Sequence, residues 1–146
     1  MQSSLQHLVE FLRQVTRGFE NLAEEIDHPS LRTAMRAISV ESKQYAKEIN
    51  NQFKQESFEM NSTKDDIWLK MEVKVNKEAD DAPGSEIAAL CSNCETYFNR
   101  LYSEVLAGLG PEHPSKELIS FQLYAINCAL MKVKLLNHAR FEEQNV

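Results

Sequence analysis

Four long segments of the chain carry apolar residues at alternating three- and four-residue steps, the spacing that lines one face of an α-helix. These segments span residues 4–26, 29–54, 85–107 and 114–141. In the first segment the apolar positions are Leu5, Leu8, Leu12, Val15, Phe19, Leu22 and Ile26. The pattern predicts four amphipathic helices that share one core.

Turn signals separate these segments. Asp27 and His28 interrupt the first pair, and Pro29 suits the first position of the next helix because its missing N–H has no partner there. Gly108 and Pro111 give the third segment a glycine-then-proline ending. The chain of 146 residues holds only four glycines and four prolines. That scarcity favours a few long helices over many short strands.

Residues 55–84 form a polar connection that contains one ordered piece. Trp68, Met71 and Val75 share one helical face, although the same run also alternates like a β-strand. Thr63 begins a sequence that resembles a helix-capping box just ahead of it. A strand would have no partner in this chain, so we expect a short helix.

The two halves of the chain resemble each other. The sequence around Phe19 matches that around Phe98, and the turn before Pro29 matches the turn before Pro114. Two helical hairpins joined by a long crossover is the arrangement of ferritin-like four-helix bundles. We therefore expect residues 1–146 to form a single all-α domain of this type, with the short helix in its crossover.

A set of residues along most of the chain fits one known family. They are Gly18, Phe19, Leu22, Ala23 and Glu24 in the first helix, Asp27, Pro29 and Leu31 at the first turn, Trp68 in the crossover, and Cys91, Glu95, Tyr102 and Leu106 in the third helix. On these residues the chain resembles a bacterial ferritin-like family known only as a domain of unknown function (type 2383). The resemblance implies the four-helix fold and points to a stress or maintenance context.

Iron-binding ferritin-like proteins hold their metals with a glutamate from each of two helices and a Glu-x-x-His motif from each of the other two. Here Glu41 is followed three residues later by Gln44, an amide in place of the histidine. Glu95 is retained, but no Asp or Glu occurs between Glu117 and Glu142. We therefore expect no conventional di-iron centre, no cofactor and no catalytic residues. An alternative is an atypical metal or redox site in the bundle core, formed by Glu41, Gln44, Glu95 and Tyr102. Buried carboxylates would need partners, and those available are Lys132, Lys134, Gln44 and Tyr45.

Two residue pairs invite a metal or redox interpretation. Cys91 and Cys94 lie near a helix start, where the helix dipole lowers thiol pKa values, but one turn apart they also fit packing as small apolar residues. His28 and His113 occupy equivalent positions in the two halves. In a ferritin-like bundle the two turns lie at opposite ends, roughly 37 Å apart by helix rise. We therefore expect buried thiols and helix-entry histidines.

Composition limits the partners. The formal charge is −6 and no basic stripe is apparent along the sequence, so we expect no nucleic-acid partner. The first residues lack the charged and apolar regions of a secretory signal, and three cysteines are an odd number for a disulfide framework. These features favour the cytoplasm.

The fourth segment is the most apolar, yet it carries Lys132, Lys134 and Arg140, so we expect it in a protein core and not in a membrane. Beside its core-facing residues it has a second apolar face, formed by Phe121, Tyr124, Cys128, Met131 and Leu135. A bundle helix needs only one apolar face. We expect the crossover and another subunit to cover the second face, which predicts a homodimer.

Together these observations favour a non-enzymatic, metal-free structural or protein-interaction module. The sequence does not identify a partner other than a second copy. Besides the atypical metal site, a third interpretation is a bundle that binds an apolar small molecule between its helices.

Overall fold

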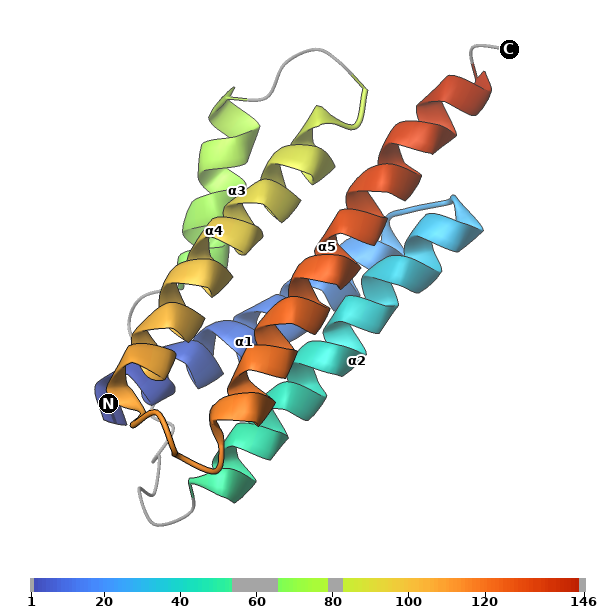
Figure 1. Cartoon of the computed structure of the whole chain (residues 1–146). Helices are drawn as coiled ribbons and strands as arrows, with labels where there is room; N and C mark the ends of the chain where they lie inside the picture. The colour runs from blue at the N-terminus through green and yellow to red at the C-terminus, as the bar shows by residue number, and fades with distance from the viewer. Residues whose placement is uncertain (1, 54–65, 79–82, 145–146) are drawn as a thin grey trace.

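All secondary structure in the described part of the chain is helical. The structure is a computed structural model that describes residues 2–53, 66–78 and 83–144. The helices are α1 (Gln2–Glu24), α2 (Pro29–Gln52), α3 (Ile67–Glu78), α4 (Ser85–Gly108) and α5 (Lys116–Gln144), shown in Figure 1. The all-α class expected from the sequence is confirmed, and the ordered piece of the crossover is the helix α3.

Four long helices lie side by side, and α3 packs on the outside against α1 and α4 (Figure 1). α1 and α2 form one hairpin and α4 and α5 the other, while α2 also contacts α5 and α1 contacts α4. Each of these neighbouring pairs runs antiparallel (Figure 1). Because α2 and α4 therefore run in the same direction, the chain between them returns along the bundle, and α3 is part of that return.

Each long helix contributes its apolar face to one core. Aromatic rings join α1 to α4, since the ring centroid of Phe11 lies 4.7 Å from that of Phe98 and 5.6 Å from that of Tyr97. Other fully buried side chains include Leu8, Leu12, Met35, Ile38, Ile119, Ile126 and Leu130. Burial of each large apolar side chain stabilises the fold by about 1.5–3 kcal/mol. This packing holds together helices that would be marginal alone in water.

Trp68 fixes α3 to the bundle. Its indole ring lies against Gly18 of α1 and meets the ring of Phe19 edge-on, with centroids 5.2 Å apart. The main-chain N–H of Trp68 donates to Oε1 of Gln14 at 3.1 Å, which satisfies one of the donors left over in the first turn of α3. Glycine is required at position 18 because a Cβ there would overlap the indole ring.

Side chains cap the starts of two helices. Asp66 Oδ1 accepts a hydrogen bond from the main-chain N–H of Leu69 at 3.0 Å and so caps α3, whereas the expected Thr63 lies outside the described residues. His28 Nδ1 accepts from the N–H of Leu31 at 3.2 Å, and its backbone is extended. The helix-entry role expected for His28 is confirmed.

The two histidine turns lie at opposite ends of the bundle. His113 Nδ1 accepts from the N–H of Ser115 at 3.1 Å, and its ring stacks on Phe53, which follows the last residue of α2. His28 precedes the first residue of the same helix. A helix of 24 residues is about 36 Å long, so the two imidazoles cannot share a ligand, as expected.

α2 and α4 begin where the sequence predicts, and the other helix limits differ from the prediction by one to three residues. α1 ends at Glu24 and not at Ile26, because the N–H groups that follow bond to carbonyls only three residues back. α5 begins at Lys116, after a turn in which the Lys116 N–H bonds to the His113 carbonyl, and continues to Gln144. The expected end of the second helix, residue 54, lies outside the described residues.

The start of α4 lies against the end of α5. Gly84, the residue before α4, has a φ of 79°, in the left-handed region that favours glycine. Asn137 Nδ2 donates to the Gly84 carbonyl at 2.9 Å, and a Cβ on Gly84 would overlap the ring of Phe141. The last turns of α5 thus determine where α4 begins.

Candidate functional site

Glu95, the carboxylate retained in the third long helix, has an ammonium as its neighbour. Lys134 Nζ of α5 lies 2.8 Å from Glu95 Oε1, and the two side chains are only 22% and 23% exposed. Lys134 is one of the four residues that the sequence offered as partners for a buried carboxylate. α5 therefore brings a positive charge to this carboxylate, the opposite of what a metal ligand would supply.

Glu41 has a separate environment. Tyr45 Oη donates to Glu41 Oε2 at 3.4 Å, as expected for a partner of this carboxylate. Burial raises the pKa of Glu41, and the hydrogen bond from Tyr45 opposes that rise. Glu41 also lines an outer groove between α2 and α5, beside Cys128 and Lys132.

The structure does not bring the four residues of the atypical site together around one point. Gln44 is exposed, Glu41 lines the outer groove, Glu95 pairs with Lys134, and Tyr102 is buried with a different partner. Among the described residues, no three His, Cys, Asp or Glu side chains converge into a cluster that would hold a metal ion.

A polar chain crosses the core where the sequence pattern showed only an apolar face. Tyr102 Oη of α4 donates to Oε1 of Gln122 on α5 at 3.0 Å. Gln122 Nε2 then donates to Glu48 Oε1 at 3.1 Å and to the Tyr45 carbonyl at 3.4 Å, both on α2. Gln122 is fully buried between Ile119 and Ile126. One buried amide thus joins three helices, and the signal in the sequence was a glutamine inside an apolar stripe.

Burial raises the pKa values of the two tyrosines of this polar chain. It raises the pKa of Tyr45 to about 12, with the nearby charges of Glu41 and Glu48 adding to the effect. It also raises the pKa of Tyr102 well above its ordinary value. The polar chain around Gln122 is therefore suited to holding the helices in register and poorly suited to exchanging protons near neutral pH.

Cys91 and Cys94 pack in the core as expected. Burial raises the pKa of Cys91 to about 12 and that of Cys94 well above its ordinary value. Neither thiol shows the lowered pKa that a reactive cysteine near a helix start would have. Cys128 is exposed on the outer side of α5.

The outer face of α5, formed by Phe121, Tyr124, Cys128, Met131 and Leu135, is exposed. The apolar side chains of Phe121, Tyr124, Met131 and Leu135 are 61%, 71%, 47% and 62% exposed. The five positions follow one another at steps of three and four, the a/d spacing of a coiled coil. Beside them, small residues of α2 and α5 line the outer groove of about 360 Å³; these residues are Ala34, Ala37, Ala125 and Ala129.

α5 is also long and apolar enough, by length and composition alone, to cross a membrane. Such helices occur in soluble cores as well, and here 28% of its most apolar window is buried. Its inner side carries the buried amides of Gln122, which bonds to α2 and α4, and Asn137, which bonds to Gly84 just before α4.

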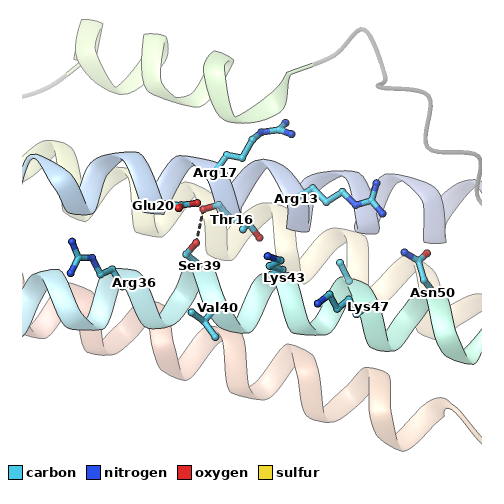
Figure 2. Close-up of a pocket in the computed structure, with 11 residues that line it drawn as sticks. Arg13, Thr16, Arg17, Glu20, Arg36, Ser39, Val40, Lys43, Lys47 and Asn50 are labelled. Carbon is cyan, nitrogen blue, oxygen red and sulfur yellow. Dashed lines mark hydrogen bonds between the residues drawn. The ribbon is translucent and has the colours of Figure 1, made fainter.

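A second exposed feature lies between α1 and α2. A groove of about 680 Å³ follows the outside of this hairpin (Figure 2). Its lining includes five cationic side chains, namely Arg13, Arg17, Arg36, Lys43 and Lys47, and one carboxylate, Glu20. The expectation that the chain has no basic stripe is thereby corrected. The sequence does not show this stripe because its cations come from two helices. On each helix they are one or two turns apart, so they do not form a continuous run of basic residues.

No family model, curated protein or solved structure matches this chain. Its function must therefore be argued from its own residues. The outer face of α5 and the groove between α1 and α2 are exposed features that the folding of the bundle itself does not explain.

Proposed function

We propose that the protein is a ferritin-like helical module that acts through protein–protein contact, without a metal centre and in the cytoplasm, and that its partner is a second copy of itself. The observation that carries the proposal is the outer face of α5. Four large apolar side chains there are 47–71% exposed on one straight helix. Exposed apolar patches of this kind mark interaction surfaces on soluble proteins.

The arrangement of the helices supports the ferritin-like part of the proposal. Two antiparallel hairpins are joined by a chain that returns along the bundle, and α3 is part of it. The contact between Gly18 and Trp68 joins two of the positions that carry the resemblance to the ferritin-like family. Their close packing gives that resemblance a physical reason.

The chemistry of α5 supports the metal-free part. At Glu95 the helix supplies the Lys134 ammonium, and in the core it supplies the Gln122 amide, whose two polar atoms are already bonded. Iron ions bind anionic oxygens and neutral imidazole. Because a nearby ammonium repels a metal cation, the Lys134 side chain of α5 disfavours an iron site at Glu95.

The spacing on α5 favours a second copy as the occupant. Positions 121, 124, 128, 131 and 135 alternate like the a and d positions of a heptad repeat, so the same face can pack on itself about a twofold axis. In an antiparallel pair, Tyr124 of one copy would lie opposite Leu135 of the other, and Cys128 opposite Met131. The axis would then pass between residues 129 and 130.

Sedimentation equilibrium tests this proposal. We expect a dimer of twice the 16.8 kDa chain mass. Tyr124→Glu combined with Leu135→Glu places four carboxylates in the apolar interface and should raise the dimer dissociation constant at least a hundredfold, or about 2.7 kcal/mol. The matched control is Leu69→Glu with Val73→Glu on α3, where the side chains are 55% and 48% exposed; it should leave the dimer intact.

A thiol-specific cross-linker gives an independent measurement. Helices that pack 8–10 Å apart would bring the two Cys128 thiols within reach of a short bismaleimide. Covalent dimers should form in the wild type and disappear in Cys128→Ser. A wild-type chain that remains monomeric at its highest soluble concentration would overturn the proposal, as would a dimer that survives the double glutamate variant. Binding of the wild type to neutral lipid vesicles instead would assign the face to a membrane.

A further inference from the structure

The α1–α2 groove concentrates positive charge in an acidic protein. The chain has 22 acidic and 16 basic residues, yet five basic side chains and one carboxylate line this groove. Figure 2 shows cations from both helices around it, with Arg13 and Arg17 on α1 and Arg36, Lys43 and Lys47 on α2. Because the net charge of the rest of the chain is negative, an anion is attracted to this groove more than to other parts of the surface.

The five cations outnumber the one carboxylate of the groove, Glu20, and none of them forms an ion pair among the described residues. Within the described residues, the ion pairs are Arg32–Asp27, Lys134–Glu95 and His138–Glu142, and none involves the groove. Arg13 and Arg17 lie one helical turn apart, as do Lys43 and Lys47, and like charges at that spacing destabilise a helix. A bound anion would remove that repulsion.

The floor of the groove is formed by small and neutral side chains. Ser39 Oγ donates to the Thr16 carbonyl at 2.7 Å, a bond that also ties α2 to α1. The Thr16 hydroxyl donates to the Leu12 carbonyl at 2.8 Å. Since these hydroxyls are already bonded, a ligand would be held mainly by the charged groups at the rim.

The rim determines the chemical class of that ligand. Arginine presents a planar fork of donors that binds phosphate oxygens in pairs, and three of the five cations are arginines. On α2 the cations extend from Arg36 to Lys47, about 16 Å along the helix. One phosphate would contact only part of this row, whereas a linear chain of phosphates would contact most of it. The volume of about 680 Å³ is that of a small-molecule site.

We propose that the α1–α2 groove binds a linear oligophosphate, held by the guanidinium groups of Arg13, Arg17 and Arg36 and the ammonium groups of Lys43 and Lys47. With Glu20, the five cations leave four positive charges, which suit a chain of about three phosphates. The lining contains no aromatic side chain on which unpaired bases would stack, so a nucleic-acid strand is disfavoured. This proposal goes beyond the dimer proposal and does not depend on it.

Isothermal titration of the full-length protein with inorganic tripolyphosphate tests the inference. We expect saturable binding with one site per chain, and at least tenfold weaker binding of orthophosphate and of sulfate. A nucleoside triphosphate distinguishes the source of the chain, since equal affinity means that only the phosphates are recognised and tighter binding means that the nucleoside contributes. Both results support the groove.

Three variants locate the site. Lys43→Gln with Lys47→Gln should weaken tripolyphosphate binding at least tenfold. The control, Lys74→Gln with Lys77→Gln, removes the same charge from α3 and should change affinity by less than twofold. Arg13→Lys with Arg17→Lys keeps the charge and should still weaken binding severalfold, because lysine lacks the planar fork. Circular dichroism would show that each variant retains its helix content.

Three results would overturn the proposal. The first is a wild type that does not retain tripolyphosphate at low salt, and the second is a loss of affinity in the α3 control pair as large as that in the groove pair. The third is a single-stranded oligonucleotide of equal charge that binds as tightly as tripolyphosphate. The second result would show a general charge effect, and the third would show a polyanion surface without the proposed selectivity.

Discussion

The indole ring of Trp68 on α3 packs directly against Gly18 of α1 and fills the space that a Cβ at position 18 would need. Phe19, the next residue along α1, meets the same ring edge-on. The main-chain N–H of Trp68 bonds to Gln14, one turn earlier on α1. Three contacts with α1 therefore help to fix α3 on the bundle.

Replacing Gly18 by alanine should destabilise the protein. An alanine inside a helix normally adds up to about 1 kcal/mol, but here its methyl group would overlap the indole, and such overpacking costs about 1–3 kcal/mol. We expect a lower midpoint in urea, read from the fluorescence of Trp68. Gly110→Ala is the matched control, because a Cβ there meets nothing within 4 Å. A Gly18→Ala protein as stable as the wild type would show that Trp68 does not fix α3.

One thiol per chain should react with a thiol reagent in the native state. Cys128 is exposed, while Cys91 and Cys94 are buried and burial raises their pKa values. At pH 8, and at concentrations low enough to keep the proposed dimer dissociated, we expect one rapid equivalent with Ellman's reagent and two more only after unfolding. Cys128→Ser should remove the rapid equivalent. Fast labelling of Cys91 or Cys94 in the native protein would contradict the buried packing of this pair.

Stability should fall as pH rises above 9. The thiols of Cys91 and Cys94 ionise near pH 9 in the unfolded chain, but the pKa of Cys91 in the fold is about 12 and that of Cys94 is also raised. The unfolded state therefore loses protons that the folded state keeps, so its free energy falls relative to the fold. Each buried thiol contributes up to roughly 1.4 kcal/mol per pH unit in this range.

Urea unfolding at a series of pH values measures this effect. Cys91→Ala with Cys94→Ala should give a flatter profile between pH 9 and 10, where the tyrosines, which ionise near pH 10 in the unfolded chain, contribute less than the thiols. Cys128→Ala should keep the wild-type slope, since that thiol is exposed. Identical slopes in all three proteins would show that the buried thiols do not cause the alkaline loss.

The hydrogen bond between Tyr102 and Gln122 should couple the effects that substitutions at these two residues have on stability. Gln122→Leu keeps most of the volume but leaves the buried Tyr102 hydroxyl without its acceptor, which costs about 1–3 kcal/mol. Tyr102→Phe removes only the hydroxyl and should cost about 1 kcal/mol. In the double variant the two losses should not add, and a double-mutant cycle measured in urea gives the coupling directly. Additive losses would mean that the bond contributes nothing to stability.

The helices could be predicted from the sequence because the residues that determine them lie close together along the chain. Periodic apolar residues, the turn at Pro29 and the glycine after the third segment lie within a few residues of the structure they determine. Even the ambiguous piece around Trp68 was correctly expected to be helical. The start of α5 was placed two residues too early, because the turn after His113 adds a hydrogen bond from Ser115 before the helix begins.

The candidate sites depend on contacts between distant parts of the chain, and these were harder to predict. The partner of Glu95 was among the expected lysines, but the role of Gln122 was not expected, since a single amide in an apolar stripe gives no sign of its three partners. The groove cations of α1 and those of α2 are at least 19 positions apart in the sequence, the distance from Arg17 to Arg36. Only the folded hairpin shows that they share one surface.

The last turns of α5 contact a glycine that lies much earlier in the sequence. Asn137 bonds to the carbonyl of Gly84, 53 residues earlier, and the ring of Phe141 occupies the space beside that glycine. Shortening the protein from its carboxyl end past Asn137 would therefore loosen the first turn of α4 and with it the junction to the crossover. Trimming or tagging the carboxyl end is therefore expected to change the packing around Gly84, in the middle of the sequence.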